Sequence, residues 1–154
     1  RPRPPNRKMS RITVAEFDAI LRQGAPFAAA LGVETVELSR ERAVFRLPYR
    51  ADFLRPGGTI SGPMMMGLAD LAMYGAVLAA VGPQELAVTT NLNINFLRKP
   101  PPAPLIAEAR LLKLGKRLAV GEVELYSEGD TEMVAHVTAT YSLPPKPDED
   151  SGPL

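Results

Sequence analysis

The chain has 154 residues, which suggests one domain, and its 45% apolar and 23% charged residues are typical of a folded globular protein. Eighteen basic and 17 acidic residues leave a net charge of +1, so the overall charge does not favour binding to nucleic acid or to a membrane surface. Cysteine is absent, which excludes disulfides, thiolate nucleophiles and zinc–cysteine sites, and the single histidine, His136, argues against a histidine-based metal site.

Both ends of the chain are rich in proline and charge, and we predict disordered tails at 1–12 and 144–154 around a single domain at 13–143. The basic N-terminal segment lacks the apolar stretch of a secretory signal, so a cytoplasmic location is expected. The domain opens with Thr13 as a helix N-cap and Glu16 in the capping-box position. Apolar residues at helical spacing follow and indicate a short amphipathic helix.

Six strands are predicted from apolar and polar alternation and from turn residues. Two of them, at 33–39 and 42–49, flank a charged turn. Beyond a long apolar segment, the other four are expected at 87–97, 105–114, 117–126 and 131–143, the last three joined by tight turns as an antiparallel meander. In the first of these four, alternation places Val88, Leu92, Ile94 and Phe96 on one face and Thr89, Asn91, Asn93 and Asn95 on the other.

A long helix is predicted between the two strand groups, beginning at Gly62 and ending before Gly82. Pro63 suits its first turn, where a missing N–H costs nothing. Asp70 is the only charged residue between positions 61 and 81. A helix that is apolar all round is either buried or spans a membrane, and Pro63 and the central carboxylate argue against a membrane. The elements together predict an α+β hotdog fold, an antiparallel β-sheet wrapped around one long central helix.

The segment 55–70, which reads Arg-Pro-Gly-Gly-Thr-Ile-Ser-Gly-Pro-Met-Met-Met-Gly-Leu-Ala-Asp, resembles the active-site signature of PaaI-like (phenylacetate-pathway type) hotdog acyl-CoA thioesterases. That family typically reads Asn-Pro-x-Gly-x-x-His-Gly-Gly, then four residues, then Leu-Ala-Asp. Pro56, Gly58, Gly62 and the Leu-Ala-Asp that ends at Asp70 match it in register. The strand at 88–97 is also similar to the family's strand after the helix, and the resemblance extends over about residues 30–143.

This resemblance implies hydrolysis of acyl-CoA thioesters to free acid and CoA, without a metal or redox cofactor. The backbone N–H of Gly62 would stabilise the oxyanion, because a helix N-terminus carries partial positive charge. Asp70 of a second subunit would act as nucleophile or general base, and Thr89 would position the water. The substrate-binding residues expected in addition are Arg55, Ser61, Met66 and Tyr74.

Three positions depart from the family pattern. Ser61 replaces the histidine, Pro63 replaces the second glycine, and Arg55 replaces the loop asparagine. A guanidinium at position 55 could pair with Asp70 or bind an acidic acyl group. The first possibility leaves open a non-catalytic acyl-CoA-binding module. A hotdog hydratase is a weaker alternative, because His136 lies far along the last strand, where a half-exposed structural histidine is expected.

Assembly and CoA contacts are the remaining expectations. A six-stranded sheet with open edges favours pairing with another copy, as a homodimer or homotetramer. Gly62 and Asp70 lie two helical turns apart, about 12 Å at 1.5 Å per residue, so one subunit cannot bring both to one thioester carbon. Basic residues at strand ends and turns form either a solvated rim or contacts for the CoA phosphates: Arg98, Lys99, Arg110, Lys113, Lys116 and Arg117.

Overall fold

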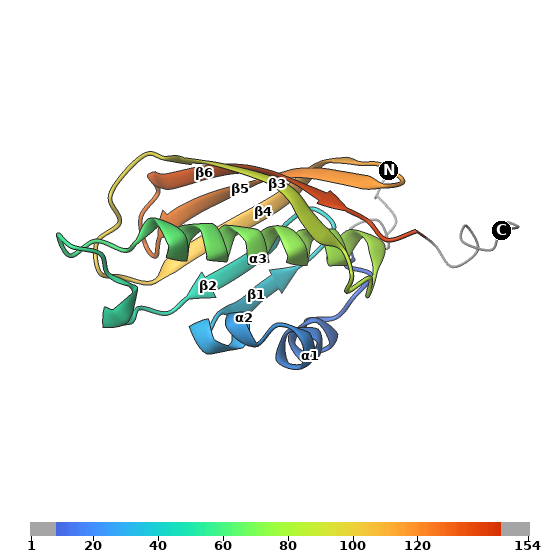
Figure 1. The fold of residues 1–154 in the computed structure, drawn as a ribbon, viewed down its shortest axis with the longest axis horizontal. Helices are drawn as coiled ribbons and strands as arrows, with labels where there is room; N and C mark the ends of the chain where they lie inside the picture. The colour runs from blue at the N-terminus through green and yellow to red at the C-terminus, as the bar shows by residue number, and fades with distance from the viewer. Residues whose placement is uncertain (1–8, 146–154) are drawn as a thin grey trace, which may run out of the picture.

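The computed structural model describes residues 9–145 and has the predicted α+β architecture, a six-stranded antiparallel sheet curved around one long helix (Figure 1). The residues before 9 and after 145 lie outside the described part of the chain. The elements in chain order are α1 (Val14–Gly24), α2 (Pro26–Leu31), β1 (Glu34–Leu38), β2 (Ala43–Leu47), a 3₁₀ turn (Ala51–Phe53), α3 (Gly62–Val81), β3 (Val88–Phe96), β4 (Leu105–Leu114), β5 (Leu118–Ser127) and β6 (Met133–Ser142). The sheet order is β1-β2-β4-β5-β6-β3, so β1 and β3 are the edges.

Helix α3 fills the concave side of the sheet and forms most of its core contacts with β2, β4 and β5. By length and composition it could cross a membrane, but most of its apolar residues are buried against the sheet, as in the core helix of a folded domain. The helix approaches the sheet closely at Gly75, where a Cβ atom would lie only 2.5 Å from Cζ of Phe45. The glycine is therefore required by packing at this position.

Helices α1 and α2 lie beside α3, on the side of the molecule away from β3 (Figure 1). The predicted capping box is present: the Thr13 hydroxyl accepts from the Glu16 backbone N–H, and the Glu16 carboxylate accepts from the Thr13 N–H. Phe17 and Leu21 of α1 are buried in the core. This pair of helices forms a second wall, which faces α3.

Part of the segment expected as an N-terminal tail packs on the domain. The backbone N–H of Arg11 donates to the carbonyl of Ala79 at 2.8 Å, and Ile12 is 2% exposed. Met9 forms an isolated antiparallel bridge with Ser39. Ordering of residues 9–12 follows from burial of Ile12, which proline content and charge alone do not reveal. Positions 1–8 and 146–154 of the two expected tails lie outside the described residues.

One predicted strand face is wrong. Strand β3 pairs with β6, and its register shifts between Thr89 and Asn91. This β-bulge reverses the alternation, because one extra residue changes which side chains face the core. Val88 is therefore 58% exposed, although alternation placed it with Leu92 on the apolar face, and Thr89 instead faces α3.

Candidate active site

The carboxylate of Asp70 is held by two hydroxyl groups from the sheet. Thr89 Oγ1 of β3 donates to Asp70 Oδ1 at 2.6 Å. Tyr141 Oη of β6 lies 2.7 Å from the same oxygen and 2.9 Å from the Asp70 backbone carbonyl oxygen. Within residues 9–145, both side-chain hydrogen bonds of Asp70 are to Oδ1, so Oδ2 remains available to a substrate or a water. The carboxylate of α3 is thus oriented by two hydroxyl groups of the sheet.

Tyr141 keeps its proton in this environment. Burial, and then the negative charge of Asp70, raise the pKa of Tyr141 above its usual value. A tyrosine with a raised pKa stays neutral through the physiological range, so it continues to donate to the carboxylate. Tyr74 stacks against Tyr141 with ring centroids 6.2 Å apart, and its hydroxyl donates to the carbonyl of Glu85. Burial also raises the pKa of Tyr74.

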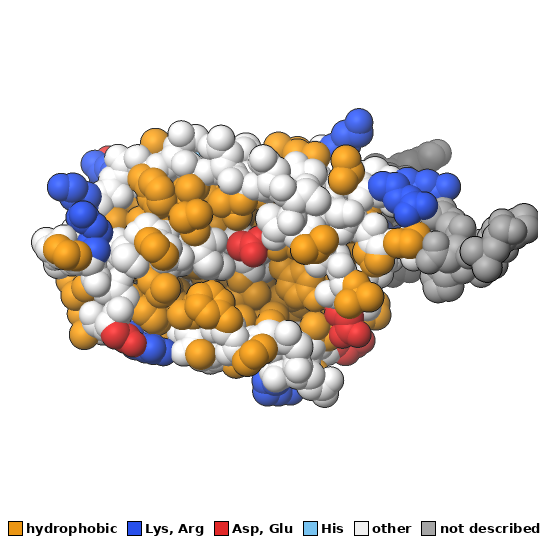
Figure 2. Space-filling model, in the orientation of Figure 1, with side chains coloured by type: hydrophobic (Ala, Val, Ile, Leu, Met, Phe, Trp, Pro, Cys, Tyr) orange, Lys and Arg blue, Asp and Glu red, His pale blue; other side chains and the backbone are white. Residues whose placement is uncertain are grey.

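Asp70 opens into an apolar pocket between α1, α2 and α3, which we call the Asp70 pocket. Its volume is about 200 Å³. Figure 2 shows that the face carrying α3 is hollowed and rich in hydrophobic side chains, with an acidic group near its centre. The pocket is lined by Leu21, Ala25, Phe27, Ala28, Leu31, Gly67, Asp70, Leu71, Tyr74 and Tyr141. Asp70 is the only aspartate, glutamate, lysine or arginine among these lining residues.

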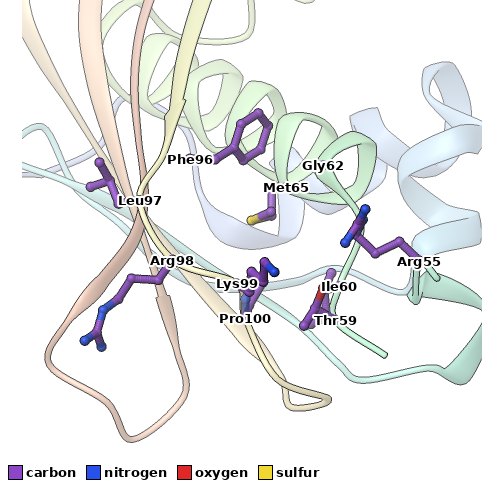
Figure 3. A pocket seen from close by; sticks show the side chains of 10 residues that line it. All are labelled: Arg55, Thr59, Ile60, Gly62, Met65, Phe96, Leu97, Arg98, Lys99 and Pro100. Atoms are coloured by element: carbon purple, nitrogen blue, oxygen red, sulfur yellow. The ribbon is translucent and has the colours of Figure 1, made fainter. Parts of the chain in front are cut away.

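A second, larger pocket lies at the start of α3, and we call it the Gly62 pocket. Its volume is about 560 Å³, and Figure 3 shows the side chains that line it: Arg55, Thr59, Ile60, Gly62, Met65, Phe96, Leu97, Arg98, Lys99 and Pro100. Gly62 is the first residue of α3, so its N–H has no acceptor within the helix. The Ser61 side chain does not cap α3. A Cβ on Gly62 would lie 3.3 Å from the Phe96 ring, so a side chain here would require that ring to shift.

Three cationic side chains border the Gly62 pocket. Arg55 extends toward the start of α3, whereas Arg98 points away from Gly62 (Figure 3). Arg98 is paired with Glu132. Within residues 9–145, neither Arg55 nor Lys99 has an ion-pair partner. The rim of this pocket is therefore suited to an anionic ligand.

The structure separates the expected site residues into two groups. Gly62 and Arg55 line one pocket, and Asp70 and Tyr74 line the other, with no residue common to both. Arg55 and Asp70 therefore do not form an ion pair within one chain. Such a pair is the basis for considering a non-catalytic acyl-CoA-binding module. Of the two other expected substrate contacts, Ser61 lines neither pocket and Met66 is 42% exposed. Met65, the neighbour of Met66, lines the Gly62 pocket instead.

His136 lies on the convex face of the sheet, opposite α3. Its Nε2 is 3.0 Å from Oε2 of Glu122, whose Oε1 accepts from Arg110 at 2.6 Å. The Arg110 and His136 partners lower the pKa of Glu122, with the hydrogen bond from His136 as the larger cause. This histidine is thus half-exposed and structural, as expected. Arg110 is likewise engaged on the convex face, away from Arg98 and Lys99 at the Gly62 pocket.

Tyr141 is a site residue that the sequence prediction missed. It falls within the predicted strand at 131–143, on the same face as Val137 and Ala139, where its spacing marks it as a core residue. A buried tyrosine hydroxyl normally finds a partner, and the only carboxylate of the core helix is that of Asp70. This argument makes Tyr141 a candidate partner of Asp70, but the order of the strands, which places β6 within reach of the carboxylate, comes from the structure.

Comparison with known proteins agrees with this architecture. Residues 57–134 match the family model of the thioesterase superfamily. A solved protein from a Silicibacter species, provisionally described as a thioesterase, shares 41% identity at a TM-score of 0.81 and covers 91% of this chain and 97% of its own. A variant of the phenylacetic acid degradation protein PaaI from Thermus thermophilus shares 33% identity at a TM-score of 0.69, with 77% and 99% covered.

The names of curated relatives also describe hydrolases. A Deinococcus radiodurans protein with the provisional name of esterase is 34% identical over 109 residues, which is 69% of this chain and 68% of that protein. The 1,4-dihydroxy-2-naphthoyl-CoA hydrolase of Listeria monocytogenes is 24% identical over 98 residues, covering 64% of this chain and 80% of that enzyme. The signature around Asp70, the fold and these relatives agree, and the chain belongs to the thioesterase superfamily as a PaaI-like hotdog protein.

Proposed function

We propose that the protein hydrolyses acyl-CoA thioesters to a free acid and CoA. The observation that carries this proposal is the position of Asp70. It is the one charged residue of a largely buried helix, it is oriented by Thr89 and Tyr141, and it lines an apolar pocket. Even partial burial of a carboxylate costs free energy that an apolar residue would not, so its retention favours a chemical role. The family to which the chain belongs supports thioester hydrolysis in general.

Asp70 can act in either of two ways. As a general base, it removes a proton from a water whose oxygen attacks the thioester carbon, and the C–S bond then breaks as the proton passes to the departing thiolate. As a nucleophile, its oxygen forms an acyl-enzyme anhydride with release of the thiolate, and water then hydrolyses that anhydride. In both routes Thr89 and Tyr141 hold Oδ1, so that Oδ2 is directed at the reacting atom.

Gly62 supplies the complementary group. In both routes negative charge develops on the thioester oxygen, and the free N–H at the start of α3 is suited to stabilise it, assisted by the positive end of the helix. The cations of the same pocket, Arg55 and Lys99, support placing the CoA phosphates on this side. Pro63 removes one N–H of the first turn but leaves that of Gly62 in place.

The active site then requires two copies of the chain. Gly62 and Asp70 line different pockets and lie about 12 Å apart along one helix. Strand β3 offers the longer open edge, nine residues against five for β1, and Val88, Phe96 and Leu97 at its ends are exposed hydrophobic residues. We therefore propose a homodimer joined along β3, in which Gly62 of one copy faces Asp70 of the other, with a tetramer of two such dimers as the larger assembly.

Thiol release from a panel of acyl-CoAs, measured alongside light scattering at the assay concentration, tests the proposal. We expect turnover from a dimer or a larger assembly. A fully active monomer would refute the shared site. Tight acyl-CoA binding without thiol release from any member of the panel would show a binding module in place of an enzyme.

A further inference from the structure

We propose that the Asp70 pocket receives the acyl group of the substrate and that Gly67 sets the size of the acyl group it accepts. The inference rests on the proposed function, because it places the thioester carbon at Asp70. Apart from Asp70, the pocket wall presents aliphatic and aromatic groups, and the two tyrosine hydroxyls are already engaged with Glu85 and Asp70. An apolar acyl group can therefore fill the pocket with its carbonyl carbon at the Asp70 carboxylate. The polar groups of the pocket wall keep their hydrogen-bond partners when it does so.

The volume of the pocket limits what fits. At about 200 Å³ it is somewhat larger than the roughly 150 Å³ cavity that holds a benzene molecule in an engineered protein. One ring or a short branched chain can be accommodated, whereas a long unbranched chain would extend past Phe27 into solvent. Phe27, on α2, is 63% exposed and forms the outer wall.

Packing does not require a glycine at Gly67. It lies one helical turn before Asp70 and lines the same pocket. A Cβ there would meet the Phe27 ring at 3.6 Å and Leu31 at 3.9 Å, which are ordinary contacts. Glycine within a helix costs roughly 0.5–1 kcal/mol relative to alanine. At Gly75 the sheet forbids a side chain, but at Gly67 an alanine fits, and what it would remove is pocket volume.

The test compares Gly67→Ala and Gly67→Leu with a matched control, Gly24→Ala. Gly24 also lies in a helix, and a Cβ there meets nothing within 4 Å, but it does not line the Asp70 pocket. The substrates are acetyl-CoA and benzoyl-CoA, and each variant is scored by the ratio of their kcat/KM values. Thioether analogues of CoA that carry the same two groups without a cleavable bond are titrated in parallel by calorimetry.

We expect Gly67→Ala to lower the benzoyl-to-acetyl ratio about tenfold, the scale of one methyl group in an apolar pocket. Gly67→Leu should abolish benzoyl turnover and keep acetyl turnover, and Gly24→Ala should leave the ratio unchanged. An equal loss on both substrates, or no change in either Gly67 variant, would overturn the inference. If the parent releases no thiol, the proposed function fails, while the size limit is still tested by the affinities of the two analogues.

Discussion

The Asp70→Asn substitution removes the charge of the candidate catalytic group while leaving its shape nearly unchanged. An asparagine amide oxygen can still accept the hydrogen bonds from Thr89 and Tyr141, so the local geometry should persist. The amide is neither a base nor a nucleophile of useful strength. We therefore expect the rate of thiol release to fall at least roughly 100-fold, with acyl-CoA binding retained.

The stability of this variant follows from two opposing effects. Each hydroxyl hydrogen bond to the carboxylate loses its ionic component, worth about 1 kcal/mol. In the other direction, a neutral amide is cheaper to keep partly buried than a charge. We expect these contributions nearly to cancel, with a change in the free energy of unfolding within about 1 kcal/mol. A markedly higher melting temperature would mean that the carboxylate is retained at a net cost in stability.

Asp18→Asn is the matched control. Asp18 lies on α1, and its Oδ1 accepts a hydrogen bond from Thr35 Oγ1 at 2.7 Å, so the same chemical change is made at a similar hydroxyl contact. The residue does not line the Asp70 pocket or the Gly62 pocket. Activity close to that of the parent is expected. Should Asp70→Asn stay folded and hydrolyse acyl-CoA as fast as the parent, the mechanism proposed for Asp70 is wrong.

Three further substitutions test the Gly62 pocket, the partner of Asp70 and the packing of α3. Arg55→Asn removes a cation proposed to lie beside the CoA phosphates, so it should lower kcat/KM for acyl-CoAs about tenfold and leave acyl-pantetheines, which lack the nucleotide, unaffected. A loss confined to acyl groups that end in a carboxylate would instead place Arg55 at the acyl group. Tyr141→Phe removes one donor to Asp70 and should slow turnover roughly tenfold. Because the pKa of Tyr141 is raised, its hydroxyl keeps its proton above the pH at which a tyrosine usually ionises. A turnover rate of the parent protein that fell steeply near pH 9 through ionisation of Tyr141 would contradict this raised pKa. Gly75→Ala places a Cβ 2.5 Å from Phe45 and should destabilise the fold by about 1–3 kcal/mol in urea unfolding, whereas an equally stable variant would show that the sheet yields there.

Features governed by local chemistry were predicted correctly from the sequence. The bounds of α3 follow from Pro63 at one end and Gly82 at the other, and the capping box of α1 follows from a four-residue pattern. The meander β4–β5–β6 follows from alternation and from the tight turns between its strands. Each of these depends on residues close together in the chain, whose preferences are set by backbone geometry.

Features that depend on distant pairing could not be derived in this way. Tyr141 reaches Asp70 across 71 positions, because β6 lies between β5 and β3 in the sheet, and alternation gives the face of a residue but not its neighbours. The Asp70 pocket exists because α1 and α2 pack beside α3, which no local pattern specifies. The part of the site that a second copy would supply depends on an interface between chains.

The bulge in β3 also affects how related sequences are to be aligned. Thr89 is opposite Tyr141 and Asn91 is opposite Thr140, so Thr90 is the extra residue between two otherwise continuous pairings. A relative whose strand runs without a bulge would lack one residue here while keeping the same side chains toward the helix. If the two sequences were aligned without a gap from Asn91 onward, every residue of the relative before the bulge would be one position out of register. A residue that points away from the helix would then be aligned with Thr89. A one-residue gap at Thr90 would be the correct alignment, and a hydroxyl that then fell opposite Thr89 would identify the same contact with the helix carboxylate.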